Sequence, residues 1–315
     1  MSTAIFIDGE VGTTGLQIRQ RLGNRTDLSF LSLDESDRKN RDRRRDMLNG
    51  ADIVILCLPD DAARGAVAMI ENPFVRVIDS SSAHRVATDW VYGMPEYGPG
   101  QAEKIAAATR VTNPGCYAIT SVSILHPLIA RGIVPANHPV TINAISGYSG
   151  GGKQMVAAFE DVENGAYSNT PFRVYGLGLT HKHVPEIKVW SGLKQPPLFV
   201  PSVGRFYQGM IVQVPLQLWS LPGNVSIYDI HAALESHYAG QRFVKVKPLA
   251  ETADMIDLEP EALNGTNELH LHVFGNAEAG QALVIGLIDN LGKGASGQVV
   301  QNLNLMIGAD TNTGL

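Results

Sequence analysis

The sequence predicts an α/β fold: a Rossmann-type doubly wound parallel sheet, followed by a second α+β domain with a large mixed sheet. In the first third of the chain, short apolar runs alternate with helical patterns, which is typical of βαβ units. After about residue 115 the strand-like segments become longer and more irregular. The 315 residues are 44% hydrophobic and 18% charged, so the chain can bury a large core and is not intrinsically disordered.

Continuous apolar runs in the first third predict strands that helices cover on both faces. Ile53–Leu58 is an example, because it contains no charged residue and no alternation of apolar and polar residues. Crossovers of this length indicate a nucleotide-binding sheet. We expect strands at Ala4–Ile7, Leu28–Leu33, Asp52–Leu58, Val75–Asp79 and Thr109–Thr112, and helices at Thr14–Leu22, Arg41–Leu48, Asp61–Ile70 and Gln101–Ala107.

The later segments predict a mixed sheet with helices. Met210–Leu218 reads as a strand in which Pro215 belongs at an edge or a bulge, because proline cannot donate a ladder hydrogen bond. Ser226 is the expected N-cap of a helix at Ile227–Tyr238. The apolar stripe of Ala295–Ile307 predicts the final helix. The other expected strands are Val140–Ser146, Glu268–Gly275 and Ala282–Asp289.

Charge and hydropathy exclude two classes of protein. The formal net charge is −6 and the pI is near 5.8, which argues against a nucleic-acid partner. The one uncharged run of membrane-spanning length, Val111–Ala130, contains Asn113, Pro114 and Pro127, so we expect no membrane span. The first residues lack the basic region of a signal peptide, and two cysteines give no disulfide framework. A cytoplasmic protein is expected.

A glycine loop follows the first expected strand. Gly9, Gly12 and Gly15 are spaced G-x-x-G-x-x-G, with Thr13 and Thr14 at the start of the next helix. Glycines let a pyrophosphate approach the backbone N–H groups of a helix N-terminus without a Cβ clash. We therefore expect a dinucleotide here. A glycine-rich turn that binds nothing is the alternative.

The charge-dense segment Asp34–Asp46 follows the second expected strand, where such sheets read the adenosine ribose. It holds six basic and five acidic residues. An acid there favours NAD and basic groups favour NADP, so the segment by itself leaves both cofactors open. A solvated helix with ion pairs between its turns is the simpler interpretation.

Cys116 is the candidate nucleophile. It follows Asn113-Pro114-Gly115 at the end of the fifth expected strand, on the side where ligands of parallel sheets bind. A thiol at a helix N-terminus feels the positive end of the helix dipole, which favours the reactive thiolate. A plain Pro-Gly-Cys turn is the alternative. Cys57, inside an apolar strand, is expected to be structural.

The segment His181–Glu186 offers a proton acceptor for this thiol. In an extended chain His181 and His183 share a face, so that one can act as a base while the other binds substrate. We expect an irregular loop here, of the kind that often carries catalytic groups. A metal site that includes Glu186 has no further ligand cluster to support it, and we expect no metal.

Two further loops offer groups for an anion. Asp79–Arg85 supplies hydroxyls and a guanidinium, and Ser146–Lys153 supplies backbone N–H groups and a lysine. Each such loop is more often a simple turn. Together with the thiol and the glycine loop, they indicate a pocket for a phosphorylated small molecule.

These motifs resemble those of the N-acetyl-γ-glutamyl-phosphate reductases, the arginine-pathway branch of the semialdehyde dehydrogenase superfamily. The resemblance extends over most of the chain. Asn113–Tyr117 and His181–Ile187 are specific to that family, whereas the glycine loop and Asp289–Gln298 are shared across the superfamily. The length and the run from Cys57 resemble the shorter, type 2 subfamily. Ala118–Thr120 departs mildly from the family pattern, which concerns helix packing and not the nucleophile.

The resemblance implies NADPH-dependent reduction of N-acetyl-L-glutamyl 5-phosphate to N-acetyl-L-glutamate 5-semialdehyde and inorganic phosphate. Cys116 would form a thioester, and His181 would be its acid/base partner. Also implied are NADP(H) as cofactor, a homodimer or homotetramer, an NADP-binding domain of residues 1–115 and 294–315, and a catalytic and dimerisation domain of residues 116–293. The expected cofactor-binding residues are Gly9, Gly12, Thr13, Thr14, Gly15 and Ser80, and the expected substrate-binding residues are Arg85, Asn113, Ser149, Lys153, His183 and Glu186.

Three alternatives are compatible with the sequence. Aspartate-semialdehyde dehydrogenase has the same fold and chemistry, but its cysteine motif lacks the Pro-Gly before the cysteine. A reductase of carrier-bound aminoadipate phosphate fits the same residues. A regulatory NADP-binding module without catalysis would need neither Cys116 nor His181.

Overall fold

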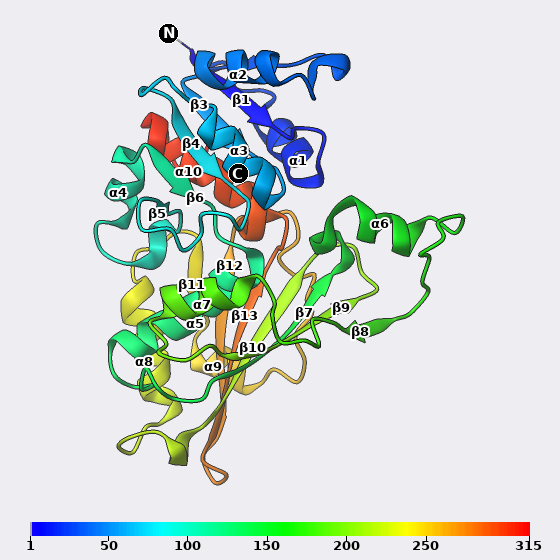
Figure 1. The fold of residues 1–315 in the computed structure, drawn as a ribbon. Coiled ribbons are helices and arrows are strands. Elements are labelled where there is room, and N and C mark those ends of the chain that lie inside the picture. Colours follow the sequence, from blue (N-terminus) through cyan, green and yellow to red (C-terminus); the bar gives the residue numbers. More distant parts are fainter. Residues whose placement is uncertain (1) are drawn as a thin grey trace. The chain divides into compact units, whose positions relative to one another are not determined.

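The computed structural model describes residues 2–315, which form two compact units, each with its own sheet (Figure 1). Unit 1 consists of the chain up to Pro95, together with Pro99–Gly115 and Ala295–Leu315. Unit 2 consists of Glu96–Gly98 and Cys116–Gly294. The expected α/β class, with one parallel and one mixed sheet, is confirmed.

Unit 1 contains a six-stranded sheet in which every pairing is parallel, in the order β2-β1-β3-β4-β6-β5. Parallel strands end at the same edge, so the loops after β1, β3, β4 and β6 share one carboxyl edge. The strands are β1 (Thr3–Asp8), β2 (Leu28–Leu31), β3 (Ile53–Leu56), β4 (Arg76–Asp79), β5 (Val91–Tyr92) and β6 (Arg110–Thr112). The helices are α1 (Thr13–Leu22), α2 (Arg41–Gly50), α3 (Asp60–Ala68), α4 (Gln101–Ala107) and α10 (Gly297–Ile307).

Apolar side chains cover both faces of this sheet, because successive strand residues point to opposite sides. Ile5 of β1 packs with α1 and α10, through Ile18 and Val299. Its neighbour Phe6 packs on the other face with Leu48 of α2. All five side chains are at most 3% exposed. The C-terminal helix α10 is therefore part of the core of unit 1.

Unit 2 contains a mixed seven-stranded sheet in the order β11-β12-β13-β10-β7-β9-β8. Helices α5, α7 and α8 lie together beside this sheet (Figure 1). The strands are β7 (Thr141–Gly147), β8 (Phe172–Val174), β9 (Leu198–Gly204), β10 (Met210–Gln217), β11 (Val244–Val246), β12 (Leu269–Asn276) and β13 (Gln281–Ile288). The helices are α5 (Cys116–Ala130), α6 (Gly152–Glu160), α7 (His183–Ser191), α8 (Ile227–Tyr238) and α9 (Leu249–Ala253).

Two details of unit 2 agree with the sequence patterns. Helix α8 has the expected bounds, and Ser226 caps it in a capping box with Asp229. Pro215 lies in β10, which is a central strand, but the pairing of β10 with β7 covers only Met210–Gln213. The missing N–H of Pro215 therefore costs no ladder bond on the β7 side.

The sequence patterns did not predict six elements of unit 2: β8, β9, β11, α6, α7 and α9. Strand β9 is absent from the expected set because Pro201 interrupts its apolar pattern. Helix α7 replaces most of the irregular loop expected at His181–Glu186, so that expectation is wrong from His183 onward. Pro185 is compatible with α7 because it stands in the first turn, where backbone N–H groups have no partner inside the helix.

Within residues 2–315, no helix combines the length and the apolar composition that crossing a bilayer demands. Helix α5, which contains most of the uncharged run described above, has 15 residues, including the interior Pro127.

Candidate active site

The glycine loop lies at the carboxyl edge of unit 1, between β1 and α1. Gly9 has φ +91°, and a Cβ there would come 2.4 Å from the carbonyl oxygen of Cys57. A Cβ on Gly15 would come 2.5 Å from the carbonyl oxygen of Gly9 and 2.7 Å from Cα of Glu10. Both obstacles are backbone atoms, so only glycine permits this close packing of loop, strand and helix.

The start of α1 fits an anion. The N–H of Gly12 donates to the Gly9 carbonyl at 3.0 Å, which closes the turn. No side chain caps α1, and its first turn has no acidic residue. The N–H groups of that turn, which includes Thr13 and Thr14, therefore have neither a side-chain cap nor a competing carboxylate.

A cavity of about 190 Å³ borders this loop within unit 1. Its lining includes Gly9–Val11, the first part of the glycine loop, Leu33 after β2, and two guanidinium side chains, Arg38 and Arg44. Nη2 of Arg44 lies 2.6 Å from Oδ2 of Asp8, in a largely buried ion pair. Among the described residues, the Nε atoms of Arg38 and Arg44 are buried without a hydrogen-bond partner. The cavity lies where such sheets bind the adenosine half of a dinucleotide, and its donors suit an anionic group.

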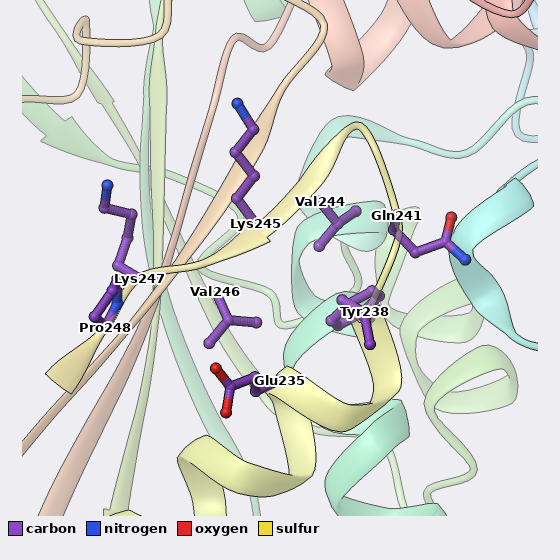
Figure 2. Close-up of a pocket in the computed structure, with 9 residues that line it drawn as sticks. Glu235, Tyr238, Gln241, Val244, Lys245, Val246, Lys247 and Pro248 are labelled. Atoms are coloured by element: carbon purple, nitrogen blue, oxygen red, sulfur yellow. The ribbon is translucent and has the colours of Figure 1, made fainter.

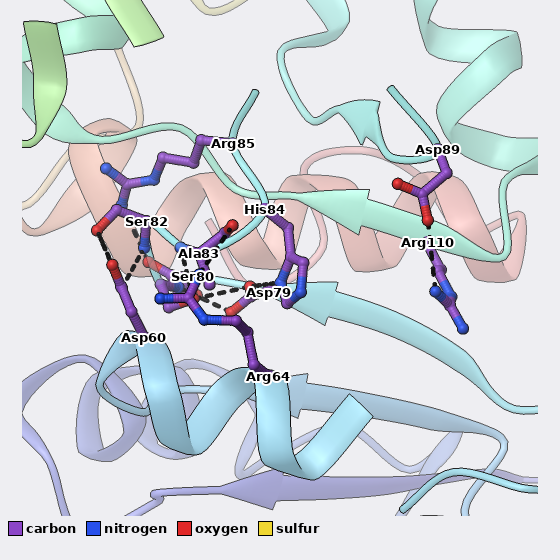
Figure 3. A network of polar contacts seen from close by, with 11 residues as sticks. Asp60, Arg64, Asp79, Ser80, Ser82, Ala83, His84, Arg85, Asp89 and Arg110 are labelled. Carbon is purple, nitrogen blue, oxygen red and sulfur yellow. Dashed lines mark hydrogen bonds and ion pairs between the residues drawn. The ribbon is translucent and has the colours of Figure 1, made fainter. Parts of the chain in front are cut away.

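A polar network fixes the loop after β4 (Figure 3). The buried carboxylate of Asp79 accepts hydrogen bonds from the backbone N–H and the hydroxyl of Ser81, both at 2.8 Å. Nδ1 of His84 lies 2.6 Å from the same carboxylate. Arg85, which is 7% exposed, donates to the Ser80 carbonyl at 3.0 Å. Ser80 and Arg85 are thus held in a constrained loop, on the same carboxyl edge as the glycine loop.

Asn113 lies after β6, but both ends of its amide are already hydrogen bonded. Its Oδ1 accepts from Nδ2 of Asn302 on α10 at 3.1 Å, and its Nδ2 donates to the Ala295 carbonyl at 3.2 Å. Asn302 also donates to the Gly93 carbonyl at 2.9 Å. Asn113 is only 1% exposed. Asn113 therefore holds the loop after β6 against α10, and its expected contact with substrate stays a prediction.

Cys116 is the first residue of α5 and is half-buried. The first turn of α5 has no acidic residue, so no carboxylate of that turn opposes the helix dipole at the thiol. Cys57 differs in its environment, since burial raises the pKa of its thiol to about 12. It lies one residue beyond β3, rather than inside the strand as expected.

His181 lies close to the turn that carries Cys116. Its ring is nearly perpendicular to that of Tyr117, and the two centroids are 5.9 Å apart. The ring centroid of His183 lies 4.8 Å from that of His181. Nδ1 of His181 accepts a hydrogen bond from the backbone N–H of His183 at 3.1 Å. In the neutral ring this arrangement places the proton on Nε2. His181 can therefore present a donor to a ligand near Cys116.

Tyr175 joins this cluster, although no sequence motif marks it. Its hydroxyl donates to that of Tyr117 at 3.3 Å, and Tyr117 donates to the Ser202 carbonyl at 3.1 Å. The ring centroid of Tyr175 lies 5.8 Å from that of His181. Burial raises the pKa of Tyr175 to about 12, and the nearby Cys116 acts in the same direction. Tyr175 thus remains protonated at neutral pH and supports the cluster through its hydroxyl.

The other expected substrate ligands of unit 2 differ in exposure. His183 and Glu186 lie on α7 and are 4% and 1% exposed. Ser149, in the 3-10 turn η3 (Tyr148–Gly151), is 2% exposed and accepts a hydrogen bond from Nδ2 of Asn290 at 3.0 Å. Lys153, near the start of α6, is exposed to solvent. Across residues 2–315, no three His, Cys, Asp or Glu side chains are grouped to hold a metal ion.

A second cavity, of about 350 Å³, lies beside α8 and β11 in unit 2 (Figure 2). Lys245 and Lys247 line it, but they pair with Glu268 and Glu251, and in Figure 2 both extend away from Tyr238. Its lining contains neither histidine nor cysteine. The cavity therefore lacks the groups of a thiol-dependent site.

Comparison with family models assigns both units. Residues 11–106 match the semialdehyde dehydrogenase NAD binding domain, and residues 116–290 match the semialdehyde dehydrogenase dimerisation domain. A nicotinamide dinucleotide is therefore the cofactor class, in agreement with the glycine loop and its uncapped helix.

Relatives with high identity cover nearly the whole chain. An N-acetyl-gamma-glutamyl-phosphate reductase of Burkholderia ambifaria is 55% identical over 304 residues, covering 96% of each chain. A protein of Nostoc named N-acetyl-gamma-glutamyl-phosphate reductase 2 is 50% identical, covering 99% of this chain and 98% of its own. Among solved structures, aspartate semialdehyde dehydrogenase II of Vibrio cholerae has a TM-score of 0.71 at 13% identity, with 98% of both chains covered. This last likeness concerns the fold alone.

The glycine loop gives a first testable prediction. Gly15→Ala should weaken binding of the reduced dinucleotide at least about tenfold, because the new Cβ collides with the backbone of Gly9 and Glu10. Fluorescence titration of the dinucleotide measures this. The matched control is Gly65→Ala in α3, where a Cβ meets no atom within 4 Å. Equal affinities for the Gly15→Ala and wild-type proteins would show that the loop does not hold the cofactor.

Proposed function

The chain belongs to the semialdehyde dehydrogenase family, and from its N-acetyl-gamma-glutamyl-phosphate reductase relatives we propose that it reduces N-acetyl-L-glutamyl 5-phosphate to N-acetyl-L-glutamate 5-semialdehyde and phosphate. This reaction belongs to arginine biosynthesis. The observation that carries the proposal is that a thiol opens α5 while the imidazole of His181 lies beside Tyr117, the next residue of that turn. Reduction of an acyl phosphate through a thioester requires that pair.

Cys116 is the proposed nucleophile. Its thiolate attacks the acyl carbon, a C–S bond forms, and the bond from the acyl carbon to the phosphate oxygen breaks with release of inorganic phosphate. The acyl group stays on the sulfur as a thioester until it is reduced. Breaking of the C–S bond then releases the semialdehyde and returns the thiolate. Arg85 and Lys153 are the proposed contacts for the phosphate or carboxylate, because both carry a positive charge that suits these groups.

His181 is the proposed acid/base residue. The hydrogen bond from the His183 N–H to Nδ1 orients its ring and, in the neutral form, leaves the proton on Nε2. From that atom the ring can donate to the oxygen on which charge develops when the thiolate attacks. His183 and Glu186, on the first turns of α7, are proposed to shape the substrate pocket around it.

Unit 1 is proposed to bind NADP(H) and unit 2 to carry the thiol chemistry. The cofactor residues are those of the glycine loop and Ser80. When bound, the reduced nicotinamide supplies the hydride. The preference for NADP is supported by the guanidinium groups of Arg38 and Arg44, which line the cavity and suit a phosphate. Of the two carboxylates in this lining, Asp8 and Glu10, the first is paired with Arg44.

A homodimer or homotetramer is the proposed assembly. The match to a dimerisation domain supports it. So does a group of exposed apolar side chains on the segment before His181, which includes Phe172, Leu177 and Leu179, exposed by 50%, 77% and 60%. The proposed location is the cytoplasm, where a thiol nucleophile stays reduced.

The thiol assignment predicts a sharp difference between the two cysteines. Cys116→Ser should lower phosphate-dependent reduction of NADP by N-acetyl-glutamate semialdehyde by about a thousandfold or more, because a hydroxyl is a far weaker nucleophile. Cys57→Ser should be nearly normal, since a thiol of pKa about 12 has little thiolate at pH 8. Mass spectrometry of trapped acyl-enzyme should locate the acyl group on Cys116. A fully active Cys116→Ser protein would refute the mechanism.

The acid/base assignment is tested by His181→Asn. We expect kcat to fall about 10²- to 10⁴-fold, while the Kd of NADPH stays within about twofold, because the loss of a proton donor affects the chemical step. His138→Asn is the control, since His138 lies in the loop between α5 and β7. Equal losses in turnover and cofactor affinity would point to a structural role for His181.

Cofactor preference is tested at Arg38. Arg38→Gln should weaken NADPH binding about 10- to 100-fold, the effect of losing one charged hydrogen bond, and change NADH binding by less than about twofold. Calorimetry with 2′,5′-ADP and 5′-ADP measures the same difference without turnover. Arg43→Gln is the matched control, because Arg43 is 55% exposed and pairs with Asp37. Parallel losses for both cofactors would contradict the assignment.

A further inference from the structure

The segment after β13 forms one wall around Cys116. The chain leaves β13 at Ile288 and turns through the π-helical segment η5 (Gly292–Ser296). A Cβ on Gly294 would come 2.9 Å from Cβ of Cys116 and 3.4 Å from its Cα. The backbone at Gly294 is therefore packed directly against the first residue of α5. A small shift of this turn would change the surroundings of the thiol.

Lys293, the neighbour of Gly294, is held by a buried ion pair. Its Nζ lies 2.8 Å from Oε1 of Glu96, and the two side chains are 0% and 1% exposed. Nζ also lies 5.3 Å from the ring centroid of Phe243. Burial lowers the pKa of Lys293, and the charge of Glu96 opposes that shift. Both charges have left water, so each depends on the other for compensation.

Glu96 is itself anchored to the helices of unit 2. It belongs to Glu96–Gly98, a short piece that clusters with unit 2 although the residues on either side of it belong to unit 1. The ring of Tyr97 stacks on His126 of α5 with centroids 4.0 Å apart, and meets Trp190 of α7 edge-on at 5.6 Å. The ion pair therefore connects the turn at Gly294 to α5 and α7, the helices that begin at the thiol and at the second histidine of the site.

A buried ion pair contributes little net stability, because desolvation of both charges offsets their attraction. An apolar pair of similar volume could fill the same space. The ion pair instead fixes geometry, since each group holds the other at one distance and direction. We propose that Lys293 and Glu96 are positioning residues, whose ion pair holds the Gly292–Ser296 turn against Cys116. This proposal rests on the proposed role of Cys116 as the nucleophile.

The test uses the full chain with Lys293→Met, Glu96→Gln, and the apolar double variant Lys293→Met/Glu96→Leu. The primary measurement is the rate of alkylation of Cys116 by iodoacetamide between pH 6 and pH 10, with the label located by peptide mass spectrometry. The secondary measurements are kcat, KM and the Kd of NADPH. Near-UV circular dichroism reports whether each variant is folded. Lys245→Met is the matched control, since Lys245 is 49% exposed and pairs with Glu268.

We expect the rate of Cys116 alkylation in the variants to differ from that of wild type by at least about fivefold within this pH range. We expect kcat to fall about tenfold or more, while KM and the Kd of NADPH stay within about threefold of wild type. The folded double variant should show the same changes, and Lys245→Met should match wild type. Wild-type reactivity and kcat in the double variant would overturn the proposal, because an apolar contact would then suffice. The double variant also decides the matter if the single variants do not fold.

Failure of the proposed function gives a different result. A wild-type protein with no acyl-phosphate reductase activity would refute the reaction assigned above. The alkylation rates would still compare the surroundings of Cys116 among variants, because that measurement needs neither substrate nor cofactor.

Discussion

The amide of Asn302 ties together three segments of unit 1 that are far apart in the sequence. It donates to the carbonyl of Gly93 and to the side chain of Asn113, while itself lying on α10. A Cβ on Gly93 would come 2.4 Å from its Nδ2, so this approach needs a glycine. A buried amide that lost these partners would be costly, which locks the loop after β6 onto the C-terminal helix. Asn113 directly follows β6, so this contact fixes the carboxyl end of that strand within unit 1.

The two thiols show how environment assigns different roles to one functional group. Cys57 follows a buried strand, and burial holds its thiol in the protonated form. Cys116 opens a helix whose first turn carries no carboxylate, and the ring of the next residue, Tyr117, contacts the rings of His181 and His183. The same contrast holds for the guanidinium groups of unit 1. Arg76 has a structural role, because it donates to the carbonyls of Ala106 and Ala108. Arg38 lines a cavity, and its buried Nε has no hydrogen-bond partner.

Elements with regular periodicity were predictable from sequence, and those set by tertiary contacts were not. Five of the six parallel strands, all but β5, and α8 follow from apolar runs and an N-cap, which are local signals. Helix α7 and strand β9 each contain a proline. A helix or strand accepts a proline only at certain positions, and those positions are known only once the bounds of the element are known. In the site, Cys116 and His181 stand out by chemistry and spacing. Tyr175, Asn302 and Glu96 could not be found this way, because their partners are between 58 and 197 residues away along the chain.

The place of α10 in the core of unit 1 has a consequence for biosynthesis on the ribosome. Val299, Val300 and Leu303 complete the same apolar cluster as Ile5 and Ile18, so the part of this face that α10 covers stays exposed until α10 emerges. At about 5 to 20 residues per second, the 200 residues after Gly115 take roughly 10 to 40 seconds to translate. Nearly all of unit 2 lies in one continuous stretch and can fold during that interval. The surface of the nascent first sheet that α10 will cover is exposed during that interval, and chaperone protection matters most there.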